Sequence, residues 1–291
     1  MNEAFELDKR EVRRAFDRAA ATYDPAAALQ REVCDRMLAR LSLVRLAPTA
    51  ILDAGSGTGY AFAGLRRRFP AASVVELDIA PAMLVAARAK SRGWRAWLAG
   101  RRRCQVCGDI DRLPLRAAAV DLVWSNLTLQ WSGDPGAALA ECFRVLRPEG
   151  LLMFSTFGPD TLQELRAAFA AADRAAHVNR FFDMHDVGDM LVHCGFGDPV
   201  MDMEHFTLTY RRVEDLMREL KALGAHNANA GRARGLFGRR AFAAVVVEYA
   251  RLRLADGRLP ATFEVVYGHA WKPKPRTGPS GRPVIDIKPA A

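Results

Sequence analysis

The residues best suited to chemistry form a glycine-rich loop between a short apolar run and a helix-compatible segment. The stretch 53–59 reads D-A-G-S-G-T-G, with glycines at alternate positions. Because glycine lacks a Cβ, such a loop can bend sharply and let a ligand approach its backbone at the carboxyl end of a strand. The pattern predicts a nucleotide-like ligand. The predicted binding residues in the loop are Asp53, Gly55, Gly57 and Gly59.

A second carboxylate ends the next apolar run. Asp78 follows the strand-like segment 73–77 and comes 19 residues after Gly59. A carboxylate at this spacing can accept hydrogen bonds from both hydroxyls of a ribose. The spacing D-x-G-x-G-x-G differs from the dinucleotide fingerprint, and together with Asp78 it resembles the S-adenosylmethionine (SAM) loop of class I methyltransferases. An ordinary glycine-rich turn is the alternative.

This resemblance implies further cofactor contacts at the ends of later strands. Asp109, in the string G-D-I-D-R-L-P, would accept a hydrogen bond from the adenine amino group, and the Ile110 amide would meet a ring nitrogen. Asn126 and Leu127 follow the next strand, and their loop would face both cofactor and substrate because α/β sheets bind ligands outside the carboxyl ends of their strands.

Apolar and aromatic side chains complete the predicted cofactor site. Ile79 and Met83 lie near the ribose carboxylate in sequence and could sandwich an adenine ring, although core packing explains Met83 equally well. The pattern F-x-x-x-A-x-x-Y ending at Tyr23 resembles the segment of these enzymes whose tyrosine lines the cofactor site. A surface or core tyrosine is the alternative for Tyr23.

The elements that position these residues alternate between strand and helix five times, from about Thr49 to Phe157. This alternation predicts a doubly wound, mostly parallel α/β sheet. The resemblance implies the seven-stranded, Rossmann-like sheet of class I methyltransferases. We expect two late strands, over 203–210 and 260–271, to pair antiparallel at the sheet edge, with a helical cap of about fifty residues between them.

The predicted organisation has four parts. Residues 1–47 form an N-terminal helical arm, and 48–158 form the SAM-binding α/β core. Residues 159–271 hold the remaining core helix, the edge strands and the cap. Residues 272–291 are rich in proline and basic side chains, which predicts a disordered tail. The sequence assigns no role to the segment 94–103.

Composition limits the class of protein. With 291 residues and 50 % hydrophobic composition, the chain can bury a full core. It has no recognisable secretory leader and no run of 18 apolar residues, which predicts a cytoplasmic protein without membrane spans. Five scattered cysteines fit reduced thiols, and the pair Cys104 and Cys107 lacks two further ligands for zinc, so no metal site is expected.

The net charge favours acidic partners. Lysine and arginine exceed aspartate and glutamate by 42 − 33 = 9, and the isoelectric point is about 9.7. The basic clusters lack the interleaved aromatic residues of single-strand binders. Residues 126–129 also lack the N-P-P-Y-type strand end used to methylate exocyclic amines. Nucleic acid is therefore not the expected partner.

Motifs more specific than those of the SAM site indicate which molecule accepts the methyl group. The strings W-S-N-L-T-L-Q-W over 124–131 and H-V-N-R-F over 177–181, with residues 16–23, 29–30 and 220–225, resemble the malonyl-acyl-carrier-protein O-methyltransferase family of biotin synthesis. This resemblance covers roughly residues 10–271. It implies methylation of the free carboxylate of malonyl-acyl-carrier protein or malonyl-CoA, initiating pimeloyl synthesis, with an acidic carrier protein as partner.

Three residues are predicted to bind the substrate: Arg180, Trp131 and Lys221. The planar fork of Arg180 can hold a carboxylate, with a structural ion pair as the alternative. Lys221 would meet a phosphopantetheine phosphate or an acidic carrier residue, with a solvated lysine as the alternative. A carboxylate acceptor is ionised at neutral pH and needs only positioning and loss of water, so no catalytic base is predicted.

Two other functions stay open at this point. The same family resembles SAM-binding assembly factors of respiratory complexes, which modify a protein side chain. Methyltransferases of small carboxylic acids share the chemistry predicted here. Incubation with labelled SAM and malonyl carrier protein separates these possibilities.

Overall fold

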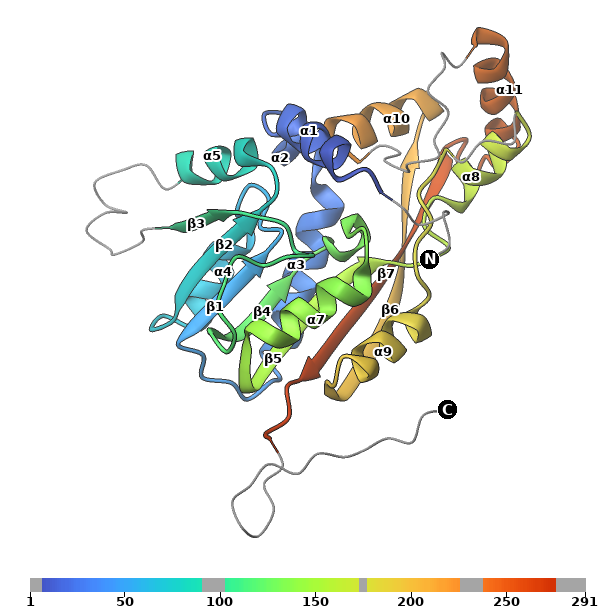
Figure 1. Cartoon of the computed structure of the whole chain (residues 1–291). Coiled ribbons are helices and arrows are strands. Elements are labelled where there is room, and N and C mark those ends of the chain that lie inside the picture. The colour runs from blue at the N-terminus through green and yellow to red at the C-terminus, as the bar shows by residue number, and fades with distance from the viewer. Residues whose placement is uncertain (1–6, 91–102, 173–176, 226–237, 276–291) are drawn as a thin grey trace.

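A seven-stranded sheet with helices on both faces forms the body of the protein (Figure 1). The computed structural model describes residues 7–90, 103–172, 177–225 and 238–275. The strands are β1 (Ala50–Ala54), β2 (Ser73–Asp78), β3 (Cys104–Cys107), β4 (Val120–Ser125), β5 (Leu146–Phe157), β6 (Gly197–Tyr210) and β7 (Leu259–Trp271). Their order is β3-β2-β1-β4-β5-β7-β6.

The first five strands are parallel and β7 is antiparallel to both of its neighbours. This confirms the doubly wound, mostly parallel fold and the antiparallel pairing of the two late strands. The chain order reverses at β1, which lies between β2 and β4. Ligands of open α/β sheets bind at such a switch point, outside the carboxyl ends of the strands.

The helices lie in an arm, on the sheet faces and in a cap. They are α1 (Lys9–Ala19), α2 (Tyr23–Ala26), α3 (Ala28–Leu41), α4 (Ala61–Arg68), α5 (Pro81–Ala89), α7 (Pro135–Val145), α8 (Gln163–Ala170), α9 (Met184–His193), α10 (Val213–Ala222) and α11 (Arg239–Ala250), with a 3₁₀ turn at Leu129–Trp131. Several starts follow from the sequence. The Asp8 carboxylate caps α1, and Asp134 followed by Pro135 begins α7.

The apolar core is divided by the sheet. One cluster joins the sheet to α3, α4, α8 and the cap, and the other joins it to α7 and α9. Trp124 of β4 is fully buried in the first cluster and Phe154 of β5 is 1 % exposed in the second. Continuous apolar runs such as 151–154 are therefore explained by strands covered on both faces.

The first helix spans Lys9–Ala19, and Tyr23 begins a separate short helix. Strand β5 starts at Leu146, directly after α7. One predicted boundary was wrong. Strand β6 starts at Gly197 rather than at residue 203, because an edge strand pairs on one side only and tolerates exposed residues and Pro199.

The arm and the cap meet above the carboxyl ends of the strands. The Thr22 hydroxyl donates to the Ala222 carbonyl at 2.9 Å. A Cβ at Gly224 would lie 3.0 Å from the Ala15 carbonyl oxygen, so these backbones pack closely. No helix in the described ranges is long and apolar enough to cross a membrane. The segment 94–102 and the tail from residue 276 lie outside the described residues.

Candidate active site

The glycine-rich loop leaves β1 and turns against the end of β2. The amides of Gly55 and Ser56 donate to the Leu77 carbonyl at 2.7 and 2.9 Å. Gly55 has φ +77°, and a Cβ there would lie 2.1 Å from Thr128 Oγ1. Only glycine combines this backbone conformation with this close approach. The loop therefore presents backbone rather than side chains to the space above the sheet.

Asp78 ends β2 and supports the same loop. Its Oδ2 accepts a hydrogen bond from the Gly57 amide at 2.9 Å, and its Oδ1 accepts one from the Ala80 amide at 2.8 Å. The residue is only 8 % exposed. Burial raises the pKa of this carboxyl to about 6, although the two backbone donors act in the opposite direction. Asp78 therefore has a buried carboxylate with lone pairs available for a further donor.

Asp53 and Gly59 have different surroundings. Burial, followed by the charges of Glu76 and Asp78, raises the pKa of Asp53 well above its usual range. Its buried Oδ2 has no hydrogen-bond donor within the described ranges. Gly59 lies against a buried ion pair between Arg103 and Glu76, and a Cβ there would collide with both side chains.

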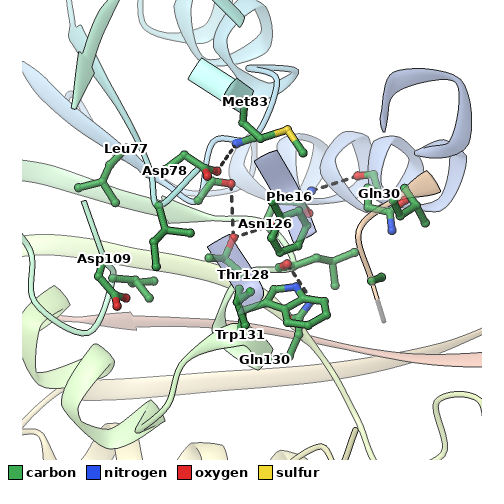
Figure 2. A pocket seen from close by; sticks show the side chains of 18 of the residues that line it. Phe16, Gln30, Leu77, Asp78, Met83, Asp109, Asn126, Thr128, Gln130 and Trp131 are labelled. Atoms are coloured by element: carbon green, nitrogen blue, oxygen red, sulfur yellow. Dashed lines mark hydrogen bonds between the residues drawn. The ribbon is translucent and has the colours of Figure 1, made fainter. Parts of the chain in front are cut away.

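A cavity lies above this loop, and Figure 2 shows its walls. Its lining includes most of the predicted cofactor residues: Tyr23, Gly55, Gly57, Asp78, Ile79, Met83, Asp109, Ile110, Asn126 and Leu127. Asp53 and Gly59 are not among the lining residues. The structure therefore brings ten of the twelve predicted residues together on the cavity wall and leaves out the two at the ends of the loop.

Asp109 occupies one end of the cavity and is held by the arm. The Lys9 ammonium lies 2.7 Å from Asp109 Oδ1 and 2.8 Å from Asp111 Oδ2. Lys9 itself lines the cavity. Lys9 was not among the residues predicted from sequence, because its contact lies 100 residues away and leaves no local pattern.

Asn126 and Leu127 form a part of the cavity wall beside the glycine loop. Asn126 Oδ1 accepts a hydrogen bond from the Ser155 hydroxyl, and its Nδ2 donates to the Gln30 carbonyl, both at 3.0 Å. Leu127 has φ +49°, and its amide donates to Ser155 Oγ at 3.0 Å. These bonds tie the end of β4 to β5 and α3.

Tyr23 and Met83 close the cavity from the arm side. Met83 is 1 % exposed and packs with Ala19 and Ala80, so the core-packing interpretation holds for it while it also lines the cavity. Burial raises the pKa of the Tyr23 hydroxyl, which therefore stays protonated. The neighbouring Asp24 accepts a hydrogen bond from Thr58 at 2.5 Å and pairs with Lys90. These contacts hold α2 against the core.

A second and larger cavity, of about 1000 Å³, lies between the arm, β5 and the cap. Its wall is mainly apolar, with contributions from Leu165, Met217, Phe242 and Phe263. Exposed cations from α1 and α10 join this wall, namely Arg18, Arg218 and Lys221. The two cavities share Gln30, Trp131, Phe157, Leu223 and Ala225. A ligand in the second cavity can thus meet a ligand in the first.

The predicted substrate residues do not lie together. Trp131 lines both cavities and contacts Phe16 edge-to-face, with 5.2 Å between ring centroids. Lys221 lines the large cavity. Arg180 is exposed and lines a smaller hollow beside Gln130, whereas its neighbours Asn179 and Phe181 line the large cavity.

The polar and apolar groups that line the first cavity fit SAM. Asp78 has lone pairs for ribose hydroxyls, Ile79 and Ile110 supply apolar faces for a purine, and Asp109 supplies an acceptor. Within the loop, Asp53 Oδ2 and Ser56 Oγ are buried without hydrogen-bond partners in the part of the chain that the structure describes. The fold and this cavity define a class I methyltransferase whose cofactor is SAM.

Comparisons with known proteins narrow the class. A methyltransferase-domain family model matches residues 52–154. The YcgJ protein of Bacillus subtilis has the same fold, with a TM-score of 0.58 at 12 % identity, over 82 % of this chain and 99 % of that one. A malonyl-[acyl-carrier protein] O-methyltransferase of Laribacter hongkongensis is 58 % identical over 100 % of this chain and 99 % of its own. One of Gallionella capsiferriformans is 54 % identical over 98 % of each chain. The chain belongs to the malonyl-[acyl-carrier protein] O-methyltransferase family.

Proposed function

We propose that this enzyme transfers the methyl group of SAM to the free carboxylate of a malonyl group carried by acyl-carrier protein. The observation that carries the proposal is the family relationship, at 58 and 54 % identity over almost the whole of each chain. The joined cavities agree with it, because one suits the cofactor and the other leads from the protein surface to it. The same relationship disfavours a protein-modifying assembly role.

The reaction requires the protein to position the acceptor carboxylate and does not require a catalytic base. Bound SAM supplies an electrophilic methyl group on a sulfonium. A malonyl carboxylate is already ionised at neutral pH, so its oxygen needs only alignment and partial loss of water. Trp131 and Phe157 supply apolar surface where the cavities meet, and Asn126 is locked by Gln30 and Ser155. These residues shape a pocket from which water is displaced when the acceptor enters.

Basic residues at the large cavity suit a carrier of acidic character. Arg18 on α1 and Arg218 and Lys221 on α10 are exposed and line the same cavity, where they outnumber the half-buried Glu214 and Glu219. Acyl-carrier proteins are acidic, and opposite charges raise the rate and specificity of encounter. Lys221 as a contact to the phosphopantetheine phosphate or to an acidic carrier residue remains part of this proposal.

Arg180 remains a candidate for orienting the malonyl carboxylate. Its exposed guanidinium lies beside the wall residues Gln130 and Phe157, outside the large cavity. A role for Arg180 would require the side chain to turn toward that cavity. The division into an arm at 1–47, a core at 48–158, and edge strands with cap at 159–271 also stays a proposal, as do a cytoplasmic location and the place of the reaction in biotin synthesis.

The test is an acceptor screen with the purified protein. Malonyl-acyl-carrier protein, malonyl-CoA, free malonate and an aconitate-like acid are each incubated with SAM, and products are identified by mass spectrometry. We expect a methyl ester on the malonyl thioester. Absence of ester on malonyl-acyl-carrier protein would overturn the proposal. Ester on the free acid alone would instead establish a small-molecule enzyme.

A further inference from the structure

Gln30 occupies the junction of the two cavities. It lies near the start of α3, and its side chain belongs to the wall of both cavities. Figure 2 shows it across the first cavity from Asp109 and Leu77. If adenine lies at the Asp109 end, the opposite end is left for the reacting part of the cofactor. Gln30 is therefore near the place where the methyl group and its acceptor meet.

The backbone of Gln30 is fixed, whereas the oxygen of its side chain has no partner. The backbone carbonyl accepts a hydrogen bond from Asn126 Nδ2 at 3.0 Å. The buried carboxamide oxygen Oε1 has no donor anywhere in the described part of the chain. A buried acceptor without a donor costs free energy. A ligand can remove this cost by supplying a donor, or by accepting from the NH₂ group once the carboxamide has turned over. A carboxamide anchored in this way is positioned to meet a ligand.

The shared wall contains few other polar groups. Besides Gln30 it consists of Trp131, Phe157, Leu223 and Ala225, and of these only Trp131 has a polar side-chain atom, the indole N–H. An anion at this junction would therefore meet neutral donors. A neutral donor orients a carboxylate and leaves its electron density available for attack, whereas an adjacent cation would hold that density more strongly.

A carboxamide also suits both reactants. Its NH₂ group can donate to a carboxylate oxygen, and its oxygen can face the electropositive carbons of a sulfonium through weak C–H···O contacts. A rotation about the terminal side-chain bond exchanges the two ends. A glutamate of the same shape would attract the sulfonium and repel the acceptor.

We propose that Gln30 binds the carboxylate of the acceptor at the junction and orients its oxygen toward the reactive methyl group. This inference rests on the proposed function, since it names the residue that recognises the malonyl carboxylate. It assigns that recognition to a half-buried neutral side chain rather than to the exposed Arg180.

The test uses Q30M, which keeps the length of the side chain and removes its polar atoms, and Q30E, which adds a negative charge. Affinities for malonyl- and acetyl-acyl-carrier protein are measured by calorimetry with S-adenosylhomocysteine (SAH) bound, and kcat and KM are measured for methylation. Acetyl-acyl-carrier protein presents the same thioester without the carboxylate. The control is Q163E at the exposed start of α8, outside both cavities.

For Q30M we expect malonyl-acyl-carrier protein to bind about 10-fold more weakly, as for loss of one hydrogen bond to a charged group. Its affinities for the acetyl form and for SAH should change less than about twofold, because neither needs the carboxylate contact. Q30E should lower kcat/KM by about 100-fold, as losses of donors at reacting anions do, and Q163E should match the wild type.

Unchanged malonyl affinity in Q30M, or equal losses for the malonyl and acetyl forms, would overturn the assignment of Gln30. Loss of SAH binding together with a lower melting temperature would also overturn it, because the side chain would then be structural. If the wild type forms no ester on malonyl-acyl-carrier protein, the proposed function itself fails. The wild-type enzyme is therefore assayed for ester formation before any variant is compared with it.

Discussion

The Lys9 ammonium bridges Asp109 and Asp111, at 2.7 and 2.8 Å, and so joins the first turn of α1 to the loop after β3. Without this cation, two carboxylates two residues apart would lie close together without a counter-charge, and one of them, Asp109, lines the cavity. The bridge holds the arm against the core at the end of the cavity assigned to adenine. Lys9 thereby positions Asp109, the predicted acceptor for the adenine amino group.

Replacing Lys9 with methionine should weaken binding of SAH about 2- to 5-fold, since a partly exposed ion pair contributes up to about 1 kcal/mol. Calorimetry measures the change. K9R should retain most of the affinity, and R10M, which alters the exposed neighbouring residue, should have no effect. Equal affinities for K9M and the wild type would show that the bridge does not position Asp109.

Asp78 should make cofactor binding depend on pH. Because burial raises the pKa of its carboxyl to about 6, the ligand-free enzyme takes up a proton there as pH falls through 6. Ribose hydroxyls donate to the ionised form, so ligand binding favours that form and lowers its pKa. Affinity for SAH should therefore be constant above about pH 7 and fall as pH drops from 6 to 5, by up to about tenfold per unit.

The variant D78N removes this titration. It should bind SAH more weakly at pH 8 and lose the fall in affinity between pH 6 and 5. Isothermal titrations at half-unit intervals give both curves. If D78N keeps the wild-type pH dependence, another group is responsible.

Local patterns were sufficient to predict most of the fold and most of the residues that line the first cavity. The alternation of apolar runs with helical segments placed β1 and β2 to within a residue or two. Glycines and carboxylates at strand ends then follow from topology, because parallel strands bring their carboxyl ends to one edge. This geometry explains why residues as distant as Gly55 and Asn126 were correctly placed on one cavity.

Contacts between distant segments could not be predicted in the same way. The Arg103–Glu76 ion pair is buried, and its only local signal was a glutamate inside an apolar run. Gln30 appeared only as part of a motif, because its position at two cavities depends on how α3 packs beside β4 and β5. Arg180 was expected at the substrate, yet its exposed side chain lines a separate hollow.

Lys272 anchors the start of the tail, directly after β7. Its ammonium donates to the carbonyls of Phe143 and Leu146 at 2.7 and 2.8 Å and lies over the Phe143 ring. K272M should lower the free energy of unfolding by about 1–2 kcal/mol, because two carbonyls lose a charged donor in a partly exposed site. The matched change K274M affects an exposed pair with Glu149 and should cost less than about 0.5 kcal/mol. Urea unfolding of both variants makes the comparison, and equal midpoints would contradict this anchoring role.

Charge reversal at Lys221 tests how the carrier is recognised. Lys221 is exposed at the large cavity, so K221E should raise the KM for malonyl-acyl-carrier protein about 5-fold and leave kcat nearly unchanged, as expected for a rim charge that guides encounter. The increase should shrink at higher salt, where charges beyond about 8–10 Å are screened. Malonyl-pantetheine, which lacks both the phosphate and the carrier, should keep its KM.

The control is Arg67→Glu on the exposed side of α4, outside both cavities, which makes the same reversal of charge at another surface. An equal rise in KM for Arg67→Glu would mean that net charge, rather than the cavity rim, attracts the carrier.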